Sequence, residues 1–151
     1  MNSPLIEGKL ALGPRPSVSD LNSLKLEGIT AIVDLNQNDR EKREAEKIGL
    51  KYCADDRLKI NDYFSPIEVD VLEYATNTIA RLISEGHYVY LHCTAGLGRS
   101  PTIAAAYLIR LGRSKDEAMA EVRKIRPMAW LEEDQNYAGA LDEFEKKCHN
   151  K

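Results

Sequence analysis

The chain has little of what membrane, secreted and nucleic-acid-binding proteins need. Its 151 residues include three cysteines, an odd number without paired spacing, so no disulfide framework is predicted. Such a chain suits a reducing compartment, and we expect a cytoplasmic protein. No apolar run approaches the roughly 20 residues of a membrane span. Residues 1–12 lack the basic and apolar regions of a signal peptide.

The charge balance and the scattered histidines exclude further classes. The net charge is −3, so no global basic field attracts nucleic acid or an anionic membrane surface. Three scattered histidines and unclustered cysteines predict neither a metal site nor a cofactor. An apolar content of 43% is enough for a sizeable core, and the length fits one domain, residues 1–151, which we expect to be a monomer.

One stretch carries the candidate chemistry. The apolar run at residues 88–91 predicts a buried strand, and residues 102–111 predict a helix. The stretch that joins them reads His92-Cys93-Thr94-Ala95-Gly96-Leu97-Gly98-Arg99-Ser100-Pro101. A strand, a tight loop and a helix start would point the backbone N–H groups of residues 93–99 into one bowl, where the helix N-terminus adds partial positive charge. The sequence therefore predicts an anion site.

The side chains of this stretch predict chemistry on a bound phosphate. Cys93 lies where N–H dipoles and a guanidinium favour the thiolate, and such settings lower a cysteine pKa to roughly 3.5–7.5. Cys93 would then attack phosphorus and form a cysteinyl-phosphate. Arg99 offers a planar fork of donors for two phosphate oxygens. Ser100 is placed to donate to the sulfur, and His92 to support the loop and the thiolate rather than to act as a base. Backbone donors for the phosphate are expected from Thr94, Ala95, Gly96, Leu97 and Gly98.

This stretch resembles the signature His-Cys-x5-Arg-Ser of the cysteine-dependent protein tyrosine phosphatase superfamily. Residues 99–102 and 106–108 resemble the dual-specificity branch of that superfamily, in its small single-domain form. Residues 95–98 are also similar to the loops of tyrosine-specific enzymes and of laforin-like glucan phosphatases. The alternative is that the motif has no catalytic role and is only a glycine-containing turn at a helix start, next to a buried free cysteine. The strand, the glycines and the helix around the motif disfavour this alternative.

Strands and helices are predicted to alternate along the chain. Strands are predicted at residues 5–12, with Gly8 and Lys9 as a possible turn, and at residues 29–35, 50–54 and 88–91. Helices are predicted at residues 18–27, 39–48, 66–85, 101–111, 115–126 and from 132 onward. The charge run at 39–48 is interpreted as a solvated face. The alternation favours an α/β fold, and the resemblance implies a four- to five-stranded, mostly parallel central sheet flanked by helices on both faces.

The resemblance also implies a general acid that protonates the departing oxygen. In dual-specificity phosphatases this acid lies just ahead of a capped helix, on the N-terminal side of the nucleophile. Asp62 fits because it lies 31 positions before Cys93 and precedes an aromatic residue and a Ser-Pro helix cap. Asp56 is the alternative acid, although a turn or hydrogen-bonding role is favoured for both Asp55 and Asp56.

Three further residues leave alternatives open. Gln135 follows a junction that resembles a glutamine-bearing loop of tyrosine phosphatases, which implies that its amide orients the hydrolytic water; an exposed helix residue is the alternative. Trp130 is either a pocket wall or a packing aromatic. Cys53 could form a regulatory disulfide with Cys93, but a buried strand cysteine is favoured.

The leading hypothesis is a metal-free phosphatase whose partners are phosphorylated protein substrates. It would act on phosphotyrosine, and also on phosphoserine and phosphothreonine, through Cys93, Asp62 and Arg99. One alternative is a phosphatase of glucan or another non-protein phosphate monoester. The other is a module that binds phosphorylated partners without catalysis, and the presence of nucleophile, clamp and acid disfavours it.

Overall fold

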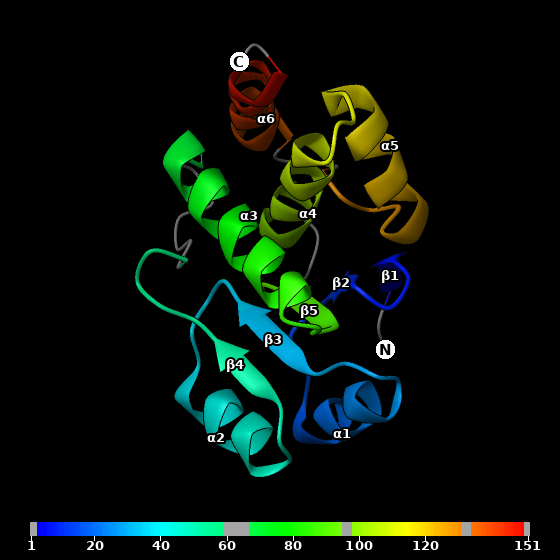
Figure 1. Ribbon diagram of the computed structural model, residues 1–151, viewed down its shortest axis with the longest axis vertical. Helices are drawn as coiled ribbons and strands as arrows, with labels where there is room; N and C mark the ends of the chain where they lie inside the picture. The colour runs from blue at the N-terminus through cyan, green and yellow to red at the C-terminus, as the bar shows by residue number, and fades with distance from the viewer. Residues whose placement is uncertain (1–2, 59–66, 95–97, 131–133, 150–151) are drawn as a thin grey trace.

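A computed structural model describes residues 3–58, 67–94, 98–130 and 134–149 (Figure 1). Its five-stranded sheet has the order β1-β2-β5-β3-β4. β1 runs antiparallel to β2, and the pairs β2–β5, β5–β3 and β3–β4 are parallel. The strands are β1 Ser3–Ile6, β2 Leu10–Gly13, β3 Ala31–Asp34, β4 Lys51–Cys53 and β5 Val89–His92. The predicted mostly parallel sheet is confirmed.

Helices cover both faces of the sheet, as predicted (Figure 1). α1 and α2 pack on one face, and α3 to α6 lie on the other. The helices in the described residues are α1 Val18–Leu26, α2 Asp39–Lys47, α3 Val69–Ser84, α4 Arg99–Arg110, α5 Lys115–Ile125 and α6 Asp134–His149.

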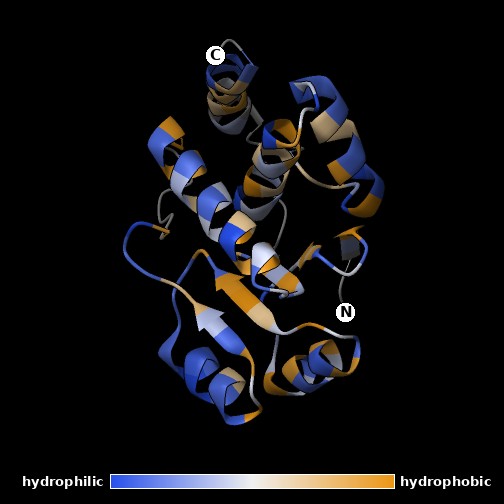
Figure 2. Cartoon of the chain, in the orientation of Figure 1, coloured by the Kyte–Doolittle hydropathy of each residue, from blue (hydrophilic) through white to orange (hydrophobic). Residues whose placement is uncertain are grey.

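Alternating strand residues build two separate cores. Ile32 and Tyr90 belong to the core with α1 and α2, whereas Val33 and Leu91 belong to the core on the opposite face. Because both faces are covered, β2, β3 and β5 are buried along their whole length. Figure 2 shows the contrast between the hydrophobic strand β3 and the largely hydrophilic helix α2. α4 is the most buried helix, since every residue in it except Arg110 is buried.

The carboxyl ends of three parallel strands meet at one edge of the sheet. Gly13 and Asp34 lie in register on either side of His92. The segments that follow these three residues therefore leave the sheet side by side, where open α/β sheets bind ligands. Backbone pairing continues past the strand ends, because the Arg15 N–H donates to the Thr94 carbonyl at 2.9 Å.

One predicted strand is a hairpin, and one predicted helix begins three residues later than expected. The stretch predicted as a strand at residues 5–12 is a hairpin, and the possible turn at Gly8 and Lys9 is present. Gly8 adopts a φ of 72° there, between β1 and β2. The helix predicted from residue 66 begins at Val69, because the Glu68 carbonyl accepts a helical bond from the Leu72 N–H at 3.2 Å. Glu68 is the N-cap and its side chain makes no capping bond, whereas Ser65, the predicted cap residue, lies outside the described residues.

The charge run of α2 faces solvent as predicted, except at one carboxylate. Glu41 and Ala45, one helical turn apart, are both buried. A buried carboxylate needs partners, and Glu41 finds them in His92 and Arg15. The inward face of α2 therefore carries a charge that the helix pattern alone assigned to solvent.

Gly13 leaves room for a buried hydroxyl group. A Cβ at this position would overlap the Tyr90 hydroxyl, which donates to the Pro14 carbonyl at 2.6 Å. We therefore predict that Gly13→Ala lowers the free energy of unfolding by about 1–3 kcal/mol, the usual cost of overpacking. Gly139→Ala in α6 is the matched control: a Cβ there meets nothing within 4 Å, and the exchange should add about 0.5–1 kcal/mol. Urea unfolding measures both, and equal midpoints would contradict the prediction.

Candidate active site

Cys93 lies at the junction of β5 and α4. It is 2% exposed, and its Sγ lies 3.5 Å from the Oγ of Ser100 in the first turn of α4. A hydroxyl group in this position can donate to an ionised sulfur. Because α4 begins at Arg99, the positive end of its dipole also favours negative charge there. These positions agree with the roles predicted for Cys93 and Ser100, which stay predictions.

Arg99 is held by two polar side chains. Its Nη1 donates to the Oδ1 of Asn36 at 2.5 Å, and its Nη2 donates to the Oγ1 of Thr94 at 3.2 Å. The Nδ2 of Asn36 also donates to the Thr94 hydroxyl. Asn36 is absent from the sequence-based predictions. The signal that could have found it is its place after β3, at the ligand-binding edge of the sheet.

The C-terminal side of the loop is held by packing and by a chain of hydrogen bonds. The hydroxyl of Thr102 donates to the Gly98 carbonyl at 2.7 Å and accepts from the Nε1 of Trp130 at 2.9 Å. A Cβ on Gly98 would lie 3.0 Å from the Tyr137 ring, so the absence of a side chain permits a close approach here. Trp130 is 2% exposed, and these contacts favour the packing aromatic over the pocket wall.

His92 is buried beneath the loop and donates on both sides of its ring. Its Nδ1 lies 2.8 Å from the Cys93 carbonyl oxygen, and its Nε2 lies 2.6 Å from the Oε2 of Glu41. Because a carbonyl and a carboxylate are both acceptors, both ring nitrogens carry hydrogen, and the ring is an imidazolium. Burial alone lowers the pKa of His92, but the hydrogen bond to Glu41 and the charge of Asp34 outweigh burial and raise it. These contacts fit the supporting role predicted for His92.

Arg15 and Asp34 complete a buried charge network with Glu41 and His92. The Oδ1 of Asp34 lies 3.7 Å from the Nδ1 of His92, and the Nη1 of Arg15 lies 3.4 Å from Glu41 and 3.9 Å from Asp34. Two carboxylates are thus balanced by two cations, as buried charges require. The Tyr52 hydroxyl donates to the Oδ2 of Asp34 at 2.5 Å. Burial, together with this bond, raises the pKa of Tyr52.

Among the described residues, one cluster has the composition of a metal site. Ligand atoms of Asp34, Glu41 and His92 all lie within 4.8 Å of one another. These side chains already have protein partners, however. The guanidinium of Arg15 also lies next to both carboxylates and would repel a divalent cation. The cluster fits an internally balanced charge network better than a metal centre.

The other predicted site residues fall in different places. Asp55 accepts from two backbone N–H groups of its own turn at 2.9 Å and from the Tyr74 hydroxyl at 2.6 Å, which supports its predicted turn role. Asp56 is exposed. The backbone of Gln135 lies in the first turn of α6, but its side chain is not among those described. The predicted residues that lie outside the described ones are Asp62, Ala95, Gly96 and Leu97.

Cys53 and Cys93 are too far apart to form a disulfide without backbone movement. Cys53 pairs with Val33, which pairs on its other side with Leu91. Two strand spacings amount to about 10 Å, whereas a disulfide needs Cα atoms within about 7 Å. Cys93 lies further along the chain than Leu91, which increases the separation. Burial also raises the pKa of the Cys53 thiol, so a packed strand cysteine is the interpretation that fits.

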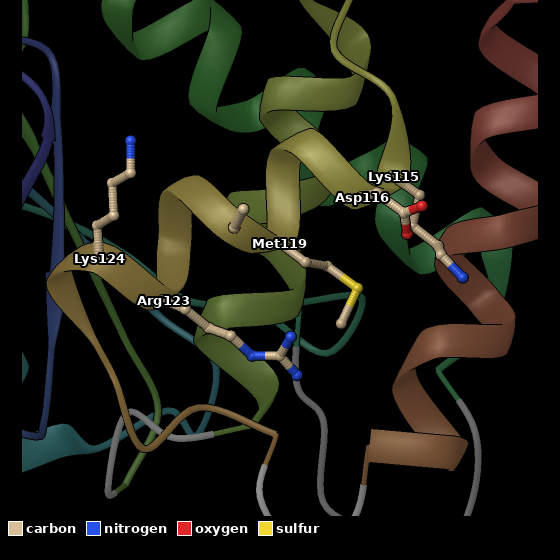
Figure 3. Close-up of a pocket in the computed structure, with 6 residues that line it drawn as sticks. Lys115, Asp116, Met119, Arg123 and Lys124 are labelled. Atoms are coloured by element: carbon tan, nitrogen blue, oxygen red, sulfur yellow. The ribbon is translucent and has the colours of Figure 1, made fainter.

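A surface hollow on α5 does not form a second site. Its volume is about 650 Å³, and it is lined by Lys115, Asp116, Met119, Ala120, Arg123 and Lys124. Figure 3 shows the Arg123 guanidinium and the Lys124 ammonium pointing in different directions, so these cations do not converge on one anion. Arg123 instead lies 5.2 Å from the centre of the Trp130 ring. A cation at this distance is attracted to an aromatic face.

A buried cysteine and an arginine at a helix start, at the carboxyl edge of a mostly parallel sheet, have the arrangement of the cysteine-dependent phosphatase superfamily. The family model described as "Dual specificity phosphatase, catalytic domain" matches residues 10–147. The chain belongs to this family. None of the helices in the described residues is long and apolar enough to cross a membrane. The cytoplasmic location stays a prediction.

Similar curated proteins carry two kinds of name. The chain is 32% identical over 124 residues to "Phosphatidylglycerophosphate phosphatase PTPMT1" of Arabidopsis thaliana. The aligned stretch covers 81% of this chain and 36% of that protein. It is 30% identical over 141 residues to "Dual specificity protein phosphatase 1" of Homo sapiens. This alignment covers 91% of this chain and 36% of that protein. The chain thus spans just over a third of the length of these two relatives.

Solved structures share the whole fold. The active form of Tk-PTP has a TM-score of 0.82 and 30% sequence identity, and the match covers 97% of each chain. The crystal structure of PTPMT1 has a TM-score of 0.79 and 23% identity, and covers 99% of this chain and 97% of that one. At that identity, the second match shows the fold alone.

Glu41→Gln tests whether His92 is an imidazolium. The amide keeps an acceptor for Nε2 but removes the negative charge, so we predict a lower His92 pKa. The free energy of unfolding should fall by about 3 kcal/mol near pH 6, at the lower end of the cost of breaking a buried ion pair, because the amide keeps the hydrogen bond. A group whose pKa is raised on folding contributes its full stability below the unfolded value of 6.5 and loses it as pH rises through the folded pKa. The difference between wild type and variant should therefore shrink as pH rises through that range.

Glu46→Gln is the matched control, because Glu46 is exposed on the same helix. It should leave both the His92 pKa and the unfolding free energy unchanged at every pH. Urea unfolding between about pH 6 and pH 9 and an NMR titration of the His92 ring provide the two measurements. A His92 pKa that is the same in wild type and Glu41→Gln would show that Glu41 does not hold the proton on the ring.

Proposed function

We propose that the chain hydrolyses phosphoric monoesters through a cysteinyl-phosphate intermediate. The observation that carries this proposal is the contact of buried Cys93 with Ser100, at 3.5 Å, beside Arg99 at the start of α4. A sulfur nucleophile, a hydroxyl that stabilises its anion and a guanidinium thus share one helix start, as nucleophilic phosphoryl transfer requires. A module that only binds phosphate has no need of the sulfur and the hydroxyl together.

In the first chemical step, the phosphate dianion binds to the loop and to the guanidinium of Arg99. The Cys93 thiolate attacks phosphorus with its own electron pair, and the bond from phosphorus to the ester oxygen breaks. Asp62 gives its proton to that oxygen, so the alcohol or phenol leaves neutral. The phosphoryl group remains on sulfur.

In the second step, water attacks the phosphorus of the cysteinyl-phosphate. Asp62, now a carboxylate, takes a proton from the water, and the phosphorus–sulfur bond breaks. Gln135 orients the water in this proposal. Ser100 donates to the departing sulfur, and the imidazolium of His92, bonded to the Cys93 carbonyl, lies beneath the same negative charge. Inorganic phosphate and the starting thiolate are the products.

Proteins that carry phosphotyrosine are the proposed substrates, with phosphoserine and phosphothreonine as slower ones. The family match and the human relative named "Dual specificity protein phosphatase 1" support this choice. Ala95, Gly96 and Leu97 carry no charge, which suits an aryl ring as the substrate group. Phenolate is also a better leaving group than an alkoxide. Phosphotyrosine should therefore react faster than the two aliphatic esters.

A second candidate substrate is the phosphate monoester of a phospholipid. The match to "Phosphatidylglycerophosphate phosphatase PTPMT1" of Arabidopsis thaliana, at 32% identity, favours it. The same loop would serve, because a lipid monoester presents the same phosphate dianion as a phosphoprotein. The two candidates differ only in what surrounds the phosphate, so turnover on a panel of substrates separates them.

We predict that kcat/KM on matched phosphopeptides is higher for phosphotyrosine than for phosphoserine or phosphothreonine by at least about tenfold, or roughly 1.4 kcal/mol. The panel adds vesicles that contain phosphatidylglycerophosphate, and phosphoglucan. A preference for the vesicles over every peptide would replace the first candidate by the second. A preference for phosphoglucan would overturn both. Cys93→Ser is the control and should lose turnover on each substrate, because a serine hydroxyl is a far weaker nucleophile here.

Asp62→Asn should remove the general acid. The loss in kcat should reach about 10²–10⁴-fold on a phosphoserine peptide, whose alkoxide needs the proton, and should be much smaller on p-nitrophenyl phosphate. The limb of the pH–rate profile that reports the acid should flatten as well. Asp56→Asn is the matched control in the preceding turn and should leave both substrates unaffected. Equal losses on both substrates in Asp62→Asn would assign the acid to another residue.

A further inference from the structure

A closed ring of hydrogen bonds joins the two ends of the phosphate loop to the segment after β3. Arg99 donates to Asn36 and to Thr94, and Asn36 donates to the Thr94 hydroxyl. Thr94 lies at the start of the loop and Arg99 at its end. Asn36 is the member of the ring that comes from another part of the chain. It therefore ties together two residues on which the proposed phosphate site depends.

The backbone around Asn36 is fixed on both sides. Its N–H donates to the Oδ1 of Asp34 at 2.8 Å, which anchors it to the buried charge network. Gln37 has a φ of 46°, the left-handed region that non-glycine residues seldom adopt. Asn38 caps α2 by accepting from the Glu41 N–H at 2.8 Å. A strained residue between two anchored neighbours is typical of a segment that has a functional role.

We propose that Asn36 is a positioning residue that orients the Arg99 guanidinium for phosphate, and that its lack of charge preserves affinity for the anion. The inference rests on the phosphate-binding role proposed for Arg99. Asn36 Oδ1 and Thr94 Oγ1 both contact the edge of the guanidinium that Nη1 and Nη2 form. This contact fixes the rotation of the planar group. The rotation of the group in turn sets the angle at which its N–H donors meet a bound phosphate.

The neutrality of Asn36 matters because a carboxylate in its place would compete with the substrate. Aspartate has the same shape and could accept from Arg99 through the same oxygen. The Thr94 hydroxyl, which can donate as well as accept, would reverse its bond and donate to the second carboxylate oxygen. The ring would therefore persist as an ion pair. Its negative charge, however, would oppose a phosphate dianion bound a few ångströms away.

Asn36→Asp and Asn36→Ala separate positioning from simple structural support. Orthovanadate, an oxyanion that mimics the transferred phosphoryl group, is the probe, and its inhibition constant is measured with p-nitrophenyl phosphate as substrate. We expect Asn36→Ala to weaken vanadate binding about tenfold, because one hydrogen bond to a charged group is lost. Asn36→Asp should weaken it on the order of a hundredfold. Gln37→Asn is the matched control, since Gln37 is exposed and asparagine accepts a positive φ.

Thermal unfolding of the same variants provides the second readout. We expect Asn36→Asp to unfold at a higher temperature than Asn36→Ala, because the aspartate keeps its bond to Arg99. Stability and vanadate affinity should thus rank the two variants in opposite orders, which a merely structural role would not produce. Gln37→Asn should match wild type in both measurements.

Two results would overturn the inference while leaving the proposed function intact. One is wild-type vanadate affinity in Asn36→Ala. The other is an Asn36→Asp variant that binds vanadate at least as tightly as Asn36→Ala. Failure of the wild-type protein to bind vanadate at all would instead overturn the proposed phosphate site, and this inference with it.

Discussion

The balance of charge in the buried network is the constraint on which the rest of the site depends. Asp34 ends β3 and Glu41 lies on α2, and both carboxylates are buried. Arg15 follows β2, and His92 ends β5. Four elements must therefore meet at one point for two negative and two positive charges to compensate one another. Removal of one partner leaves an uncompensated buried charge, which costs about 3–5 kcal/mol in comparable pairs.

The network also sets the direction of the loop backbone. The Cys93 carbonyl accepts from His92, and the Thr94 carbonyl accepts from the Arg15 N–H. Both carbonyl oxygens thus accept hydrogen bonds from donors within the protein. A carbonyl oxygen that faced a bound anion would repel it, so this arrangement favours a loop that presents donors to the substrate. The stability of the fold and the polarity of the proposed site depend on the same bonds.

The strand before Cys93 and the helix after it were predictable because their signals are local. Apolar residues, glycines and a helix start follow one another within a short stretch. The groups that hold the loop were not predictable in this way, because they come from distant parts of the chain. Glu41 and His92 are 51 positions apart, and Asn36 and Arg99 are 63 positions apart. The charge run of α2 predicts a solvated helix, since nothing in a helical pattern marks which one of its carboxylates will meet a buried histidine.

The positively charged side chains near the loop differ in the groups that accept their hydrogen bonds, which are carboxylates in some cases and neutral groups in others. Arg15 and His92 contact carboxylates, so their charge is balanced within the protein and serves the fold. The guanidinium of Arg99 contacts Asn36 and Thr94, which are neutral, so these two bonds orient the group without cancelling its charge. In a chain whose net charge is −3, attraction of an anion has to be local. In the proposed site, the neutral amide of Asn36 orients Arg99 without adding a negative charge that would oppose the anion.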